Sequence, residues 1–159
     1  SQAYCFFWDQ LEKANLFLQA VIDTRDLPFE SREVDWLFSN PISDGGTFTG
    51  VADLVTKYGL VPSNVMPESY IANSTSAMAT QLRTLLRKDG LELRGELSGV
   101  KKKDVPAKLE SMKVEMLKDV YRVLALSFGV LAVSMARCMR YSTTDTCMTD
   151  RTGFMSIFR

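Results

Sequence analysis

A turn with two adjacent glycines, N-P-I-S-D-G-G-T-F at residues 40–48, is the part of this sequence best suited to contact another molecule. Gly45 and Gly46 allow positive φ and let another chain approach the backbone closely. Pro41 favours an extended conformation at the residue before it and excludes a helix through the turn. Asp44 can accept hydrogen bonds from nearby backbone N–H groups and brace the turn. Most such turns are only connections, but this pattern also allows another chain to come close to the main chain.

Side-chain catalysis by a Ser-His or Cys-His pair is excluded for this chain alone, because it has no histidine. The three cysteines, Cys5, Cys138 and Cys147, are odd in number and sparse. They do not indicate a disulfide framework, and they favour a reducing compartment. Cys5 lies beside an apolar stripe with no base or cation near it, so we expect a buried, inert thiol. No cofactor and no metal site are predicted.

The charge pattern gives no general reason to expect nucleic acid or an anionic membrane as a partner. Lysine and arginine together number 19, as do aspartate and glutamate, so the formal net charge is zero. Three consecutive lysines at 101–103 fall in an expected loop without interleaved aromatic residues. They predict a solvated surface, and nucleic-acid binding is not expected from this fragment.

Helices are predicted on both sides of the glycine turn, and the longest apolar pattern comes first, over residues 1–22. Its apolar residues follow a 3.6-residue period: Tyr4, Phe7, Trp8, Leu11, Ala14, Leu18, Val21 and Ile22. The narrow polar strip that remains consists of Asp9, Glu12, Lys13, Gln19 and Asp23. A helix with so much apolar surface is usually buried on more than one side.

The rest of the pattern predicts a mainly α fold. Further helices are expected at residues 31–38, 49–58, 74–93 and 106–129. Ser31 is the expected N-cap of the first of these, and Gly59 ends the second. Residues 60–70, with two prolines, predict an extended loop. Gly90 costs about 1 kcal/mol relative to alanine inside a helix, which allows a break there.

Both ends of the sequence suggest a piece of a longer polypeptide. The chain opens with Ser1 directly in an amphipathic pattern, without an initiator methionine or a secretory signal. After Gly129 the helical periodicity fades. We therefore expect two parts, residues 1–129 as an internal fragment of a domain and residues 130–159 as a divergent tail without an evolved fold. The nearly uncharged segment Val123–Ala136 has 14 residues, fewer than the about 20 that a membrane span needs.

Six blocks of sequence occur in a particular order. They are S-Q-A-Y at 1–4, F-F-W-D-Q-L-E-K-A at 6–14, N-P-I-S-D-G-G at 40–46, K-Y-G-L-V-P at 57–62, P-E-S-Y at 67–70 and E-M-L-K-D-V-Y-R-V-L within 112–129. Together they resemble the bleomycin hydrolase (aminopeptidase C) branch of the papain-like cysteine peptidases. The resemblance covers residues 1–129, and the ordered set is more specific than any single block.

This resemblance implies a fragment from the helical region of an α+β, cytoplasmic thiol aminopeptidase that is often hexameric. Such enzymes use a cysteine nucleophile, a histidine base, an orienting asparagine and an oxyanion-hole glutamine. None of the four is matched here, because Cys5 and Gln2 fall at other positions of the family pattern. The implied partners are a peptide substrate and the remainder of the parent chain, and the fragment alone is expected to be inactive.

The resemblance also implies a role for the glycine pair. In papain-like enzymes a Gly-Gly segment lines the nonprimed side of the cleft, and its backbone pairs with extended substrate. Gly45 and Gly46 are therefore the substrate-binding candidates, with Asp44 bracing the turn, and no catalytic residue is predicted in this chain. Two alternatives remain: a non-enzymatic helical interaction module, and a membrane-associated protein anchored by Val123–Ala136.

Overall fold

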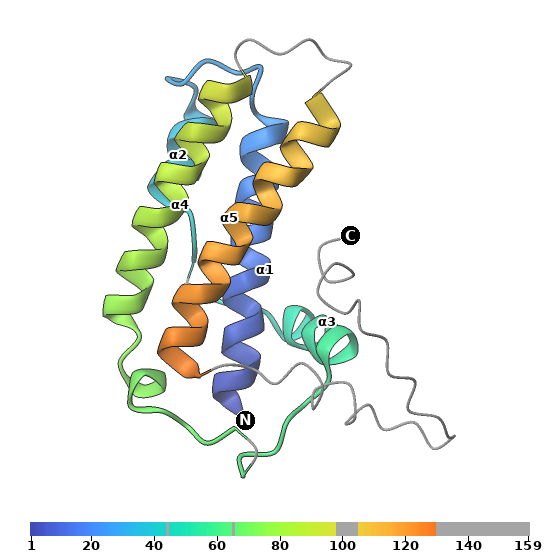
Figure 1. The fold of residues 1–159 in the computed structure, drawn as a ribbon, viewed down its shortest axis with the longest axis vertical. Helices are drawn as coiled ribbons and strands as arrows, with labels where there is room; N and C mark the ends of the chain where they lie inside the picture. Colours follow the sequence, from blue (N-terminus) through green and yellow to red (C-terminus); the bar gives the residue numbers. More distant parts are fainter. Residues whose placement is uncertain (44, 65, 98–104, 130–159) are drawn as a thin grey trace.

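Three long helices form the body of the protein (Figure 1). The computed structural model describes residues 1–43, 45–64, 66–97 and 105–129. Helix α1 spans Gln2–Asp23, α4 spans Ser76–Leu97 and α5 spans Val105–Phe128. Each packs against the other two, and α5 runs antiparallel to α4. The described part of the chain contains helices and no strand, which agrees with the predicted mainly α class.

Three shorter helices complete the described structure: α2 (Arg32–Ser39), α3 (Phe48–Tyr58) and the 3-10 helix η1 (Tyr70–Asn73). The Ser31 side chain caps α2 by accepting a hydrogen bond from the Val34 N–H, as predicted. Thr47 caps α3 in the same way through the Gly50 N–H. Gly59 follows α3 with a φ of 75°, so the predicted glycine stop is confirmed.

Helix α4 differs in two details from what the sequence pattern indicated or allowed. Helix α4 begins at Ser76, two residues later than predicted, and it continues through Gly90 without a break. A Cβ at Gly90 would lie 3.0 Å from Cε1 of Phe38 and 3.2 Å from Cζ of Phe17. Glycine is therefore explained here by the close approach of α1 and α2 to α4, and not by an interruption of the helix. The short helix η1, at the end of the predicted extended loop, was not expected.

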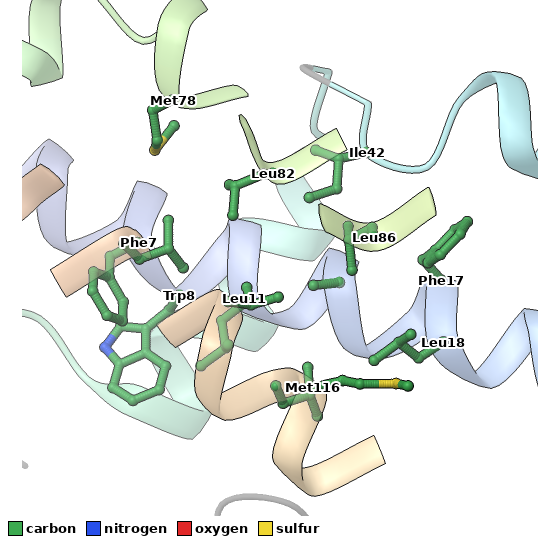
Figure 2. Packing of buried hydrophobic residues seen from close by; sticks show 14 of the residues in the cluster. Phe7, Trp8, Leu11, Phe17, Leu18, Ile42, Met78, Leu82, Leu86 and Met116 are labelled. Atoms are coloured by element: carbon green, nitrogen blue, oxygen red, sulfur yellow. The ribbon is translucent and has the colours of Figure 1, made fainter. Parts of the chain in front are cut away.

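Helix α1 lies at the centre of the molecule. Eleven of its 22 residues are buried, and it contacts α2, α3, α4 and α5. The prediction that it is buried on more than one side is confirmed. Figure 2 shows side chains of α4, such as Leu82 and Leu86, packed toward Leu11 of α1. Both α4 leucines are 0% exposed, and full burial of a leucine contributes about 1.5–3 kcal/mol.

Some predictions fall on residues outside the described ranges. These are the lysine run at 101–103, the tail at 130–159 with Cys138 and Cys147, and the second half of the segment Val123–Ala136. Within the described ranges, no helix is both long enough and apolar enough to cross a membrane.

Candidate functional site

The glycine turn connects α2 to α3, and its first part differs from the glycines in burial. Ile42 is 4% exposed, and Figure 2 places it beside Leu82 and Leu86 of α4. Gly45 and Gly46 are exposed, whereas Asp44 lies outside the described residues. The first part of the turn therefore belongs to the core, and the glycines face outward.

The two glycines are not explained by the packing of the chain itself. Neither has a φ in the left-handed region, where the described glycines are Gly59 and Gly129. A Cβ built on Gly45 or Gly46 would have no described atom within 4 Å. Among the described residues, the backbone N–H and C=O of Gly46 also have no hydrogen-bond partner. One of the two uses of glycine expected from the sequence, positive φ, therefore does not apply, and the other, close approach by another molecule, stays a prediction.

A groove of about 450 Å³ lies beside the glycine pair, between α1 and α3. Leu16 of α1 and Leu54 of α3 give it apolar surface, and Asp53 of α3 adds a carboxylate. Gly45 and Gly46 form part of its wall, so their main chain borders a concave surface. Leu16 is 64% exposed, so it adds apolar surface that solvent or a ligand can reach.

Lys13 of α1 ties the turn to this helix. Its Nζ donates hydrogen bonds to the carbonyl oxygens of Ser43, at 3.0 Å, and Gly45, at 2.8 Å. The same ammonium forms an ion pair with Oδ2 of Asp9 at 2.6 Å, one helical turn earlier. An ammonium group has three N–H donors, so these three acceptors satisfy it completely.

Glu12 of α1 bonds to the last two residues of α3. Its Oε1 accepts hydrogen bonds from the Tyr58 hydroxyl and from Nζ of Lys57, the latter at 2.5 Å. Burial tends to raise the pKa of Glu12, but the hydrogen bonds from Lys57 and Tyr58 outweigh it and lower that pKa. Burial and the neighbouring Glu12 carboxylate both raise the pKa of Tyr58. Tyr58 also stacks on Trp8, with ring centroids 4.0 Å apart and planes 8° from parallel.

The start of α1 is held by the segment that follows α3. Oε1 of Glu68 accepts hydrogen bonds from the backbone N–H groups of Gln2, at 2.9 Å, and Ala3, at 3.3 Å. It also accepts one from the Ser1 hydroxyl, at 3.1 Å. A carboxylate at this position satisfies free donors of the first helical turn and interacts favourably with the helix dipole.

These contacts bring together the sequence blocks that carry the family resemblance. Asp9, Glu12 and Lys13 belong to the block at 6–14. Asp9 pairs with Lys13 inside this block, whereas Lys13 also bonds to the block at 40–46 and Glu12 bonds to the block at 57–62. Sequence analysis assigned these three residues to the polar strip of α1 and missed their partners. Their position inside a resemblance block was the signal that could have identified them.

The described residues offer no catalytic centre of their own. Cys5 is a free, half-buried thiol that packs against the core, so it is less buried than expected. The whole chain has no histidine. Within the described ranges, no group of three or more His, Cys, Asp or Glu side chains could hold a metal ion. What this site can offer chemically is an open stretch of main chain beside a groove.

Comparison with known proteins gives the family. Residues 1–146 match the Peptidase C1-like family. Aminopeptidase C from Lactobacillus helveticus is 46% identical over 127 residues, which cover 80% of this chain and 28% of that protein. Aminopeptidase E from the same organism is 40% identical over 129 residues, which cover 81% of this chain and 28% of that protein.

A solved structure gives the same result. The crystal structure of PepW from Lactobacillus rhamnosis matches with a TM-score of 0.76 and 40% sequence identity, covering 82% of this chain and 28% of that chain. The present chain thus spans about 28% of the length of these relatives. The resemblance to the aminopeptidase C branch is confirmed, and the non-enzymatic alternative is not favoured. This chain belongs to the Peptidase C1-like family.

Proposed function

We propose that this chain is part of a papain-like cysteine aminopeptidase of the bleomycin hydrolase type and supplies one wall of its substrate cleft. In the intact enzyme a cysteine thiolate attacks the peptide carbonyl, and the C–N bond breaks to release the protonated amine product and leave an acyl-enzyme thioester. Water then hydrolyses the thioester, which releases the carboxylic acid product and restores the cysteine. The nucleophile, the histidine and the asparagine come from the remainder of the parent chain. The fragment alone is therefore inactive towards peptides.

The observation that supports this proposal is the glycine pair beside the groove. Both glycines are exposed, neither needs a positive φ, and neither is crowded by the described residues. Glycine at both positions is useful if a second main chain lies against them, since a Cβ would hold that chain away. Extended peptides bind in this way through backbone N–H and C=O groups, with little dependence on sequence.

Several parts of this proposal rest on the family alone. Asp44 braces the turn, the parent enzyme is cytoplasmic and assembles as a hexamer, and its substrates are peptides with a free amino terminus. The remainder of the parent chain completes the cleft and covers apolar side chains that α3 exposes. Phe48, for example, is 88% exposed in the described structure.

A chimeric enzyme tests the cleft-wall assignment. The 127 aligned residues of Aminopeptidase C from Lactobacillus helveticus would be replaced by the corresponding residues of this chain. Hydrolysis of aminoacyl-coumarin substrates is then measured for the chimera and for Gly46→Val. We expect Gly46→Val to raise KM about tenfold or more, because its side chain displaces the substrate backbone.

Gly95→Val is the matched control, because a Cβ at this α4 glycine also meets no described atom within 4 Å. It should leave KM within about twofold. Equal KM values for the chimera and Gly46→Val would contradict the wall assignment. Peptide hydrolysis by residues 1–159 alone that a thiol-reactive reagent inhibits would contradict the prediction that the fragment is inactive.

A further inference from the structure

We propose that Lys13 is a positioning residue of the peptide-binding wall, whose ammonium group fixes the glycine turn so that the Gly46 main chain stays open toward the groove. This inference rests on the proposed function of the turn. It adds a residue on α1, outside the turn, that determines how the turn is presented.

The geometry indicates a dedicated contact. The three N–H donors of the Lys13 ammonium meet three acceptors: the Asp9 carboxylate at 2.6 Å and the carbonyls of Ser43 and Gly45 at 3.0 and 2.8 Å. The Lys13 side chain is only 18% exposed, so its long stem is covered and its charge is directed into the turn. A surface lysine that served only for solubility would not need this covered position.

Asp9, the partner of Lys13 on α1, holds the ammonium group in place. Asp9 and Lys13 are four residues apart on one face of the helix, where their side chains meet. Helix α1 is the most central element of the fold and contacts four other helices. The ammonium is therefore held by a helix that packs against four others, and the turn is held by the ammonium.

Contacts other than those of Lys13 hold the two ends of the turn. Ile42 anchors one side through burial in the core, and Thr47 begins the other side as the N-cap of α3. Between these two residues, Lys13 is the side chain that bonds to the described part of the turn. Lys13 therefore holds the described main chain of the turn at Ser43 and Gly45, from a helix outside the turn.

The contact also selects which main-chain groups remain available. The Gly45 carbonyl is occupied by the ammonium, whereas no described residue bonds to the N–H or C=O of Gly46. A peptide entering the groove therefore meets a donor and an acceptor on Gly46 that no described residue occupies. Lys13 thus determines which main-chain groups of the turn can pair with the peptide, and it also keeps the backbone of the turn ordered.

The first test measures turn order without any enzymatic activity. Residues 1–159 are labelled with 15N-glycine, and the order parameters of the Gly45 and Gly46 amides are compared between the natural chain and Lys13→Met. We expect a fall from about 0.85, typical of rigid backbone, to below about 0.6 in the variant. Lys118→Met is the matched control, since Lys118 forms only an exposed pair with Glu115 on α5.

The amide of Gly90 in α4 reports whether the bundle is intact. If Lys13→Met unfolds the chain, Lys13→Gln replaces it, because this change keeps part of the side-chain stem and removes the ammonium group that bonds to Ser43 and Gly45. A folded variant with unchanged Gly45 and Gly46 order parameters would overturn the inference.

The second test uses the chimeric aminopeptidase described above. We expect Lys13→Met to raise KM about fivefold or more while kcat changes less than twofold, because the chemical groups lie elsewhere. Lys118→Met should change neither value. An unchanged KM for Lys13→Met, alongside a raised KM for Gly46→Val, would overturn the Lys13 inference alone. An unchanged KM for Gly46→Val would instead overturn the proposed function of the wall.

Discussion

The two sides of α1 are stabilised by different interactions. On one side, α4 and α5 pack against it through fully buried side chains such as Leu86 and Leu124. On the other side, no residue of α3 is fully buried, and polar contacts from Glu12 and Lys13 hold α3 and the glycine turn in place. The bundle should therefore be sensitive to lost volume, and the α3 side to single lost charges or hydrogen bonds.

The strongest test of this comparison is a large-to-small change in the bundle. Leu86→Ala removes a leucine that is 0% exposed and leaves a cavity between helices. We expect the free energy of unfolding to fall by about 3–4 kcal/mol in urea titrations. Leu126→Ala, at a position 86% exposed on α5, should cost less than about 0.5 kcal/mol. Similar losses for the two variants would show that the α1–α4–α5 contacts do not form the core.

A buried carboxylate in the bundle should be destabilising at neutral pH. Asp89 is 5% exposed, and its Oδ2 has no hydrogen-bond partner among the described residues. Burial, with smaller effects of Asp119 and Glu92 and opposed by Lys88, raises the pKa of Asp89 from 3.8 to about 6. Because the folded state holds the proton more tightly, the contribution of Asp89 to stability is greatest below about pH 4 and is lost as pH rises through about 6.

Asp89→Asn removes this effect. We expect the free energy of unfolding at pH 7 to rise by about 1–2 kcal/mol, less than the full effect of the raised pKa because the amide is also buried. The natural chain should lose stability relative to the variant between pH 4 and 6. Parallel stability curves for the two proteins over that range would rule out this role for Asp89.

On the α3 side, the pH dependence should have the opposite sign. The pKa of Glu12 is lowered, so its contribution is complete above about 4.5 and is lost as pH falls through the lowered value. Glu12→Gln removes the ion pair with Lys57 and weakens the hydrogen bond from Tyr58. We expect a loss of about 1 kcal/mol, a small value because the Lys57 and Glu12 side chains are 49% and 24% exposed.

Hydrogen exchange can localise the effect of Glu12→Gln. Backbone amides of α3 should exchange faster in the variant, whereas those of α4 should keep their protection. Equal acceleration in both helices would mean that α3 and the bundle unfold as one unit and that the distinction drawn here is wrong.

The smallest expected effect concerns two glycines of α4. Gly90→Ala should lower the free energy of unfolding by about 1 kcal/mol, because its Cβ would crowd Phe38 at 3.0 Å and Phe17 at 3.2 Å. Gly95→Ala meets no described atom within 4 Å and should gain up to about 1 kcal/mol from helix propensity. Thermal unfolding of both variants measures the difference, and a gain at both positions would show that the two phenylalanine rings move aside easily.

Much of the helical framework could be predicted from local patterns. The first helix, the caps at Ser31 and Gly59 and the mainly α class followed from apolar periodicity and capping chemistry. The sequence allowed a break at Gly90 but did not explain the glycine, because helix propensity does not include the rings that pack against that residue. The glycine turn was identified as a candidate from its residue types, but its groove was not.

The sequence by itself determined where the helices form, which face of α1 is apolar and which turn exposes bare main chain, because these properties depend on neighbouring residues. Only the tertiary structure decided what the polar strip of α1 does. Lys13 meets carbonyls 30 and 32 positions away, and Glu12 meets Lys57 45 positions away. A polar strip has the same sequence pattern whether it faces water or another segment, so its partners exist only once the chain has folded back on itself.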